Sequence, residues 1–140
     1  MADYAPISPY LLYRDAQAAI DFLGRAFGFE EVLRVGGHDG RVVHAELRLG
    51  PRSVMLSELG PDYRPPRETG GRNALVHLYV DDVDALFRRA VQAGAEVMNE
   101  PEDKPEGDRR GDLLDPEGQW WSLSQHVRDV PPEEWGGTVT

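Results

Sequence analysis

Three segments of the chain, residues 41–49, 74–80 and 119–126, carry polar or aromatic side chains at every second position. This spacing places residues on one face of a β-strand. Histidine in such rows acts as a general base, as a metal ligand or as a hydrogen-bonding contact for an organic ligand, and aromatic groups stack on that ligand. The candidate ligand-binding residues are His44, Glu46, Arg48, His77, Tyr79, Trp120, Ser122 and His126.

Each candidate also has a plainer interpretation. His44 and His77 either stabilise the sheet, contact a ligand or form a non-standard metal cluster with Glu46, which shares a strand with His44 while His77 lies on a neighbouring strand. Glu46 and Arg48 either orient a base or form an ordinary ion pair. Trp120 is either a core residue or a stacking surface. The residue types alone therefore assign no catalytic group.

The opposite faces of the same segments are apolar, and we expect them to pack against helices. The candidate residues then line a cup of mixed aromatic and polar character, which suits an organic ligand. The residues expected to face the helices are Val43, Ala45, Leu47 and Leu49, then Val76, Leu78 and Val80, and finally Trp121 and Leu123.

The elements that position these faces occur in the same order twice. Residues 7–13 predict a strand, and Asp15 caps a helix that Gly28 closes. Strands are expected at 31–35, 41–49 and 53–59. In the second half a strand at 74–80 precedes a helix capped by Asp81-Asp82 and ended by Gly94. Asp15 and Asp81, like Gly28 and Gly94, are 66 residues apart, and this agreement favours two copies of one motif.

The sequence thus divides into a first βαβββ module over residues 5–59 and a second over 74–126, within one domain. Residues 60–73, rich in proline and glycine, are expected to form a linker or flap without regular structure. The second module continues with a strand at 96–98, a polar loop at 99–110, a short strand near 112–114 and a last strand at 119–126. Arg109 and Arg110 in that loop either hold an anionic group or are solvated. Residues 127–140 form a surface tail.

Composition excludes several classes of protein. The chain has 140 residues and a formal net charge of −10, which disfavours nucleic-acid binding. It has no cysteine, so any metal would need His, Asp or Glu ligands. No apolar run approaches the roughly 20 residues of a membrane helix, and the first residues lack the pattern of an export signal. We expect a cytoplasmic protein that contacts neither membrane nor nucleic acid.

Several sequence strings resemble the vicinal oxygen chelate superfamily, which includes glyoxalase I, the bleomycin-resistance proteins and the extradiol dioxygenases, and most closely its small PhnB-like branch. They are PYLLYRDAQAAIDFLGRAFGFEE, HAELRLG with VMLSE, LYVDDVDALFRRAVQAGAEV, GDRRG and DPEGQWWSLSQHVRDVPPEE. The resemblance implies an α+β fold in which two βαβββ modules form an eight-stranded open barrel or cup with helices outside. It also implies a homodimer.

The metal ligands of that superfamily do not transfer to this chain. The matching positions hold Ser8, Ala74 or Leu75, Ser122, and Val54 or Met55, none of which makes up the usual His/Glu set. We therefore expect a small-molecule-binding protein without metal or other cofactor, which sequesters a toxic compound or antibiotic. The alternative is a metal-dependent lyase, isomerase or dioxygenase with a rearranged site, and a third class is a purely structural dimeric module.

Overall fold

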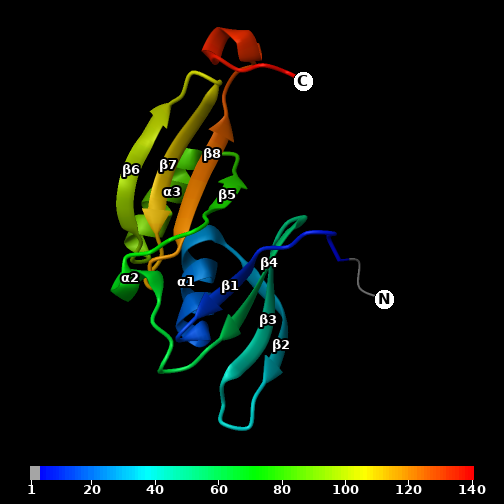
Figure 1. The fold of residues 1–140 in the computed structure, drawn as a ribbon, viewed down its shortest axis with the longest axis vertical. Helices are drawn as coiled ribbons and strands as arrows, with labels where there is room; N and C mark the ends of the chain where they lie inside the picture. Colours follow the sequence, from blue (N-terminus) through cyan, green and yellow to red (C-terminus); the bar gives the residue numbers. More distant parts are fainter. Residues whose placement is uncertain (1–3) are drawn as a thin grey trace.

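The computed structural model describes residues 4–140, so the first three residues, on which the expected lack of an export signal partly rests, lie outside the described part. The first module follows the predicted order of strand, helix and three strands (Figure 1). Its sheet has the order β1-β4-β3-β2, with β1 parallel to β4 and the other pairs antiparallel. Its elements are β1 (Tyr10–Tyr13), α1 (Ala16–Phe27), β2 (Glu30–Gly36), β3 (Val42–Leu49) and β4 (Arg52–Glu58).

The second module repeats this topology in a sheet of order β5-β8-β7-β6, again with one parallel pair. The α+β fold of two βαβββ modules is therefore confirmed, although the two sheets form an open cup and are not closed into one barrel. The elements are α2 (Pro66–Thr69), β5 (Val76–Tyr79), α3 (Val83–Gln92), β6 (Glu96–Asp103), β7 (Asp108–Leu114), β8 (Trp120–His126) and the 3₁₀ helix η1 (Pro132–Trp135).

Local sequence explains both long helices. The Asp15 carboxylate accepts a hydrogen bond from the Ala18 backbone N–H at 3.0 Å, and the Asp82 carboxylate accepts one from Ala85 at the start of α3, so both helices begin at an acidic cap. Gly28 closes α1 at a φ of 86°, in the left-handed region that glycine adopts without strain. None of the helices described within residues 4–140 has the length and apolar character of a membrane span.

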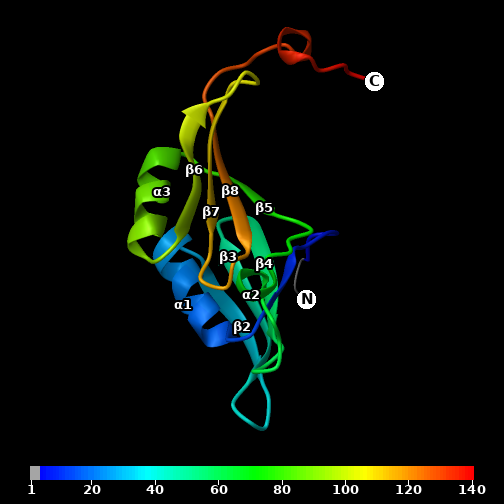
Figure 2. The same ribbon diagram turned by 60° about the vertical axis from the view of Figure 1, so that its left-hand side comes forward.

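The two long helices cover one side of the molecule and leave the other side of both sheets free (Figure 2). The core lies between helices and sheets and is continuous between modules, because Phe27 of α1 contacts Trp121 of β8 with ring centroids 5.0 Å apart. Trp121 and Leu123 are completely buried on this side. The cup face, meaning the helix-free faces of the two sheets, therefore carries the alternate side chains of every strand.

One predicted strand face is wrong at a single residue. Val43 is 47% exposed, whereas Val42 is 4% exposed and belongs to the core. The pairing of β2 with β3 shifts here, since Val35 pairs with His44 and Gly36 pairs with Val42. This bulge inserts Val43 as an extra residue and turns it away from the helices. Ala45 and Leu47 lie on the predicted apolar face.

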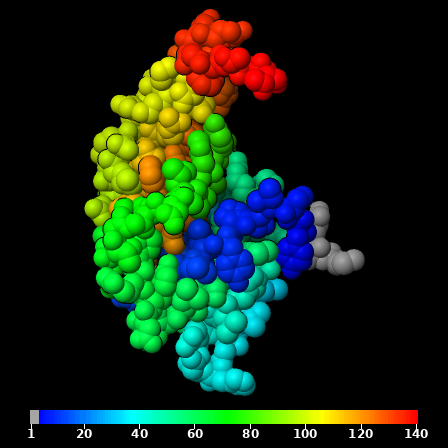
Figure 3. Space-filling view, viewed as in Figure 1, coloured from blue at the N-terminus to red at the C-terminus, as the bar shows by residue number. Residues whose placement is uncertain are grey.

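Regular structure extends further than predicted in the second half. The predicted polar loop at 99–110 is mostly strand, with β6 running to Asp103 and β7 beginning at Asp108. The flap contains the short helix α2, and the tail contains η1. Arg14 of the first module donates to the Tyr63 carbonyl oxygen at 2.8 Å and pairs with Glu68. The flap therefore packs beside the N-terminal segment (Figure 3).

Candidate functional site

The first polar cluster lies on the cup face of the first module and joins Tyr10 on β1 with His44 and Glu46 on β3. Tyr10 Oη is 2.6 Å from His44 Nδ1, and His44 Nε2 is 3.2 Å from Glu46 Oε1. The side chain of Glu46 is only 12% exposed and that of His44 23%. Tyr10 itself is 48% exposed, so this chain of three groups opens to solvent at its phenol end.

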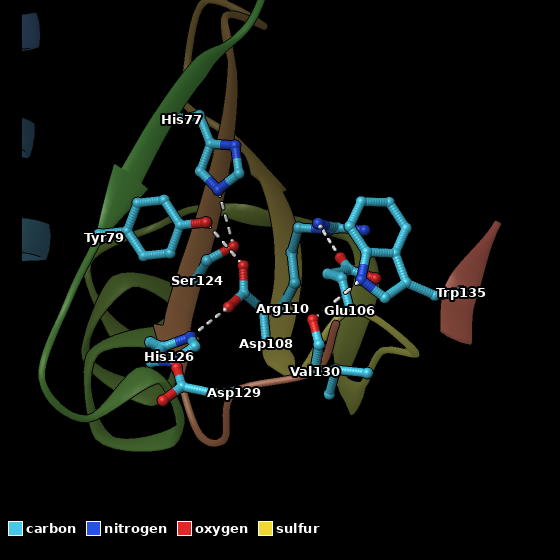
Figure 4. A network of polar contacts seen from close by, with 10 residues as sticks. All are labelled: His77, Tyr79, Glu106, Asp108, Arg110, Ser124, His126, Asp129, Val130 and Trp135. Carbon is cyan, nitrogen blue, oxygen red and sulfur yellow. Dashed lines mark hydrogen bonds and ion pairs between the residues drawn. The ribbon is translucent and has the colours of Figure 1, made fainter. Parts of the chain in front are cut away.

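The second cluster surrounds Asp108, the first residue of β7, on the cup face of the second module (Figure 4). Tyr79 Oη donates to Asp108 Oδ2 at 2.6 Å, and His126 Nδ1 is 3.1 Å from Asp108 Oδ1. The other ring nitrogen of His126 is 2.7 Å from Asp129 Oδ1. Asp108 is 6% exposed. Its carboxylate is held by hydrogen bonds with Tyr79 of β5 and His126 of β8.

Next to this cluster His77 stacks on Tyr79, with ring centroids 5.0 Å apart and planes inclined by 13°. His77 Nε2 is also 2.8 Å from the hydroxyl of Ser124, which is completely buried. His77 thus has a structural hydrogen bond on one side and an aromatic neighbour on the other. Its ring and that of Tyr79 together form a flat aromatic surface on the cup face.

A third set of contacts centres on Asp112 in the middle of β7. Its carboxylate accepts hydrogen bonds from Trp120 Nε1 at 3.1 Å and from Asn99 Nδ2 at 3.1 Å. Ser122 pairs with Asp112 across the strands and is 3% exposed. These contacts fix the indole of Trp120, which is partly exposed at the N-terminal end of β8.

Hydrogen bonding shifts the pKa values of these groups. Desolvation raises the pKa of the Asp108 carboxyl, but the hydrogen bonds from Tyr79 and His126 outweigh it, and the pKa lies below its usual range. The bond to Asp108 raises the pKa of Tyr79. The contacts with Asp129 and then Asp108 raise the pKa of His126. At Asp112 desolvation is likewise outweighed by hydrogen bonds, so that its pKa is lowered.

The structure places most of the predicted candidates on the cup face but divides them between clusters. His44 and Glu46 belong to the first cluster, while His77, Tyr79 and His126 belong to the second. His44 and His77 are therefore on different sheets. Trp120 and Ser122 adjoin Asp112.

The expected ion pair between Glu46 and Arg48 does not form, because Glu46 contacts His44 instead. Arg109 is not in a solvated loop either: it lies on the helix side of β7 and pairs with Asp84 of α3 at 3.1 Å. Arg110, on the cup face, pairs with Glu106 at 2.8 Å. Both arginines are thus held by carboxylates of the chain itself.

Sequence reasoning missed Tyr10 and Asp108. Tyr10 is at an alternate position of the predicted first strand, so a count of strand faces would have placed it in the cup. The sequence predicts a loop at Asp108, because no pattern within β6 and β7 indicates the strand that turns its side chain toward Tyr79. The partners of both residues are distant in sequence and give no local signal.

A small pocket lies where the two sheets meet on the cup side. It has a volume of about 260 Å³, and residues of β1, β5 and the start of β8 line it, including Tyr10, Leu75 and Trp120. Its walls are mainly apolar or aromatic. The first cluster borders this pocket through Tyr10, whose side chain is part of the lining.

The residues present do not fit the metal site of related folds. Of the positions that would supply ligands, Val54 is a core residue and Ser122 is a buried hydroxyl. Within residues 4–140 no three His, Asp or Glu side chains are grouped so that they could hold a metal ion.

Two βαβββ modules around an open cup with mixed polar and aromatic lining define a class of protein. The family model described as the Glyoxalase/Bleomycin resistance protein/Dioxygenase superfamily matches residues 6–123, and the chain belongs to this superfamily.

The chain is similar to other proteins both in sequence and in structure. The uncharacterized protein Mb0911c of Mycobacterium bovis is 44% identical over 133 residues, covering 91% of this chain and 88% of the relative. The anthracycline biosynthesis protein DnrV of Streptomyces peucetius is 50% identical over 58 residues, which are 41% of this chain and 20% of that protein. The crystal structure of TioX from Micromonospora sp. ML1 matches with a TM-score of 0.68 and 32% identity, covering 89% of this chain and all of TioX.

Proposed function

We propose that the protein binds a small organic molecule with aromatic character on its cup face, without a metal ion, and thereby sequesters a toxic compound or antibiotic. One observation carries this proposal. The cup face combines exposed aromatic rings with hydrogen-bonding groups that are already held in place by neighbours, as at His77, Tyr79 and Trp120. Such a surface offers stacking together with directed hydrogen bonds.

Relatives support the choice of ligand class. DnrV carries a name that places it in anthracycline biosynthesis, and its similarity to this chain extends over 58 residues. A polycyclic aromatic ligand of that kind would stack on the His77–Tyr79 surface or on Trp120. The net charge of −10 favours a ligand with a basic group.

We propose further that two copies of the chain form a homodimer in which the second copy covers the cup. The cup side carries exposed apolar or aromatic side chains from both sheets, including Leu12, Val43 and Leu75, each 38% to 47% exposed. A second copy would remove these side chains from water. Light scattering is expected to give about twice the chain mass of 15.6 kDa. A monomer at micromolar concentration would contradict the covered cup.

Calorimetric titration with an anthracycline tests the binding proposal. We expect binding by the wild-type protein and affinity reduced by about 1–2 kcal/mol in Trp120→Ala, which removes a stacking surface. His38→Ala, an exposed change in the β2–β3 turn, is the control and should leave the affinity unchanged. Equal affinity of Trp120→Ala and His38→Ala would rule out stacking on Trp120.

Elemental analysis of protein purified without chelator distinguishes this proposal from the metal-dependent alternative. We expect substoichiometric metal, and we expect added Zn²⁺, Ni²⁺ or Mn²⁺ to leave the melting temperature unchanged, because a ligand that binds the folded state raises it. One metal ion per chain would instead support a lyase, isomerase or dioxygenase with a rearranged site.

A further inference from the structure

We propose that Tyr10, His44 and Glu46 form a proton relay that activates the Tyr10 hydroxyl, so that this phenol oxygen acts as a general base toward a weakly acidic proton of a bound ligand. The activity goes beyond ligand binding and does not depend on the ligand class proposed above. It rests on the geometry of three side chains from β1 and β3, which lie on either side of β4.

The carboxylate of Glu46 fixes the direction of the relay. An ionised carboxylate only accepts hydrogen bonds, so the His44 Nε2 atom at 3.2 Å must carry the proton. The other ring nitrogen of a neutral imidazole, Nδ1, then has a lone pair and accepts the Tyr10 O–H at 2.6 Å. Hydroxyl, imidazole and carboxylate follow one another in the order found in nucleophile–base–acid triads.

Structural need does not account for this arrangement. Tyr10 is 48% exposed, so folding does not require a buried hydrogen-bond partner for its side chain. By contrast, the Glu46 side chain is 12% exposed, and holding a carboxylate there has a desolvation cost. Its only hydrogen bond or ion pair among the described residues is with His44. The partly buried carboxylate of Glu46 thus orients the imidazole of His44, and this imidazole contacts the hydroxyl of Tyr10.

The chemistry follows from this direction. When the Tyr10 oxygen takes a proton from an O–H group or from a C–H group next to a carbonyl, its own proton passes to His44 Nδ1. Glu46 stabilises the imidazolium that forms, and the ligand retains the electron pair as an alkoxide or enolate. Tyr10 is 48% exposed and also lines the pocket of about 260 Å³ where the two sheets meet, so a ligand can contact its side chain from the cup face.

Tyr79 provides a matched control within the same chain. It is 47% exposed, nearly the same as Tyr10, and lies on the equivalent strand of the second sheet. Its hydroxyl donates to the carboxylate of Asp108, and this hydrogen bond raises its pKa. Tyr79 stacks on His77, whose Nε2 contacts Ser124. The hydroxyl of Tyr10 therefore contacts an imidazole, whereas the hydroxyl of Tyr79 contacts a carboxylate.

Labelling with an arylsulfonyl fluoride tests the relay. In this reaction the Tyr10 oxygen forms a bond to sulfur, the sulfur–fluorine bond breaks, fluoride leaves, and the phenol proton passes to His44. Tandem mass spectrometry locates the label. We expect Tyr10 to react at least about tenfold faster than Tyr79, and Glu46→Gln to remove most of this advantage while circular dichroism remains that of the wild type. Equal rates at the two tyrosines, or an unchanged Tyr10 rate in Glu46→Gln, would overturn the proposal.

A second measurement does not depend on access of the reagent. The ¹⁵N chemical shifts of the His44 ring report which nitrogen is protonated, and we expect the proton on Nε2 in the wild-type protein near neutral pH. A proton on Nδ1 would reverse the relay and overturn the proposal. The labelling rate of Tyr10 and the ¹⁵N shifts of His44 can be measured even if the protein binds no anthracycline or forms no dimer. The relay can therefore fail independently of the proposed function.

Discussion

Tyr13 and Asp115 join the two modules by a hydrogen bond of 2.7 Å between residues 102 positions apart in sequence, each only 1% exposed. Asp115 also accepts from Trp121 Nε1 at 3.2 Å and from the backbone N–H groups of Glu117 and Gln119. The turn that follows β7 is therefore attached to the core of the first module. Burial raises the pKa of both Asp115 and Tyr13.

Replacing Tyr13 with Phe tests the energetic importance of this bond. The change removes one hydroxyl and leaves a buried carboxyl with a lost partner, so we expect the free energy of unfolding to fall by about 1–3 kcal/mol in urea denaturation. Tyr4→Phe, at a 53% exposed tyrosine, is the control and should change stability by less than about 0.5 kcal/mol. Equal effects of the two changes would show that the bond contributes nothing net.

Gly118 in the same turn allows the flap to approach. Its φ is +89°, and a Cβ there would lie 2.6 Å from the backbone nitrogen of Arg67 in α2. We expect Gly118→Ala to destabilise the protein by more than about 1 kcal/mol, since both backbone strain and a steric clash oppose it. Gly40→Ala has the same sign of φ but no atom within 4 Å, so it isolates the strain. Thermal melts of the two variants should differ, with Gly118→Ala lower.

The elements with strong local signals were predictable from sequence. Asp15, Gly28 and the apolar stripe between them defined α1, and alternation on β5 and β8 placed His77, Tyr79 and Trp120 on the cup face. In each case a cap or a period of two residues determines the conformation without distant partners. The confirmed repeat of the two modules rests on the same signals.

Other features depend on tertiary contacts. All but one residue of β6 are exposed, so this edge strand shows no alternation between apolar and polar residues, and Pro101 further obscured it. The bulge at Val43 arises from the pairing of β2 with β3, which no local pattern records. The contact of Tyr10 with His44 spans 34 positions. Long-range contacts therefore determine these features, including the first cluster of the candidate site.

The contact between His126 at the end of β8 and Asp108 at the start of β7 is expected to depend on pH. The raised pKa of His126 means that its contribution to stability is complete below the pKa of the unfolded chain and is lost as pH rises through the folded value. The lowered pKa of Asp108 means that its contribution is lost as pH falls through its own folded value. The contact is thus strongest at weakly acidic pH, between about 4 and about 6.5.

Titration of the His126 ring protons by NMR measures this directly. We expect a midpoint above the ordinary histidine value of about 6.5. Asp129→Asn should lower the midpoint, because the carboxylate 2.7 Å from His126 Nε2 is the larger cause of the shift. A midpoint of His126 at or below about 6.5 would exclude a charged contact with the tail.

His77 is expected to affect stability as well as binding, because its ring covers the buried hydroxyl of Ser124 at 2.8 Å. His77→Ala should therefore lower the free energy of unfolding by about 1–3 kcal/mol in urea, the cost of leaving a buried hydroxyl without a partner. Ser124→Ala in the same background removes that hydroxyl and should recover part of the loss. If the loss in free energy of unfolding of the double variant equals the sum of the losses of the two single variants, the two residues are not coupled. The hydrogen bond then does not explain the effect of His77→Ala, and the stacking of His77 on Tyr79 does.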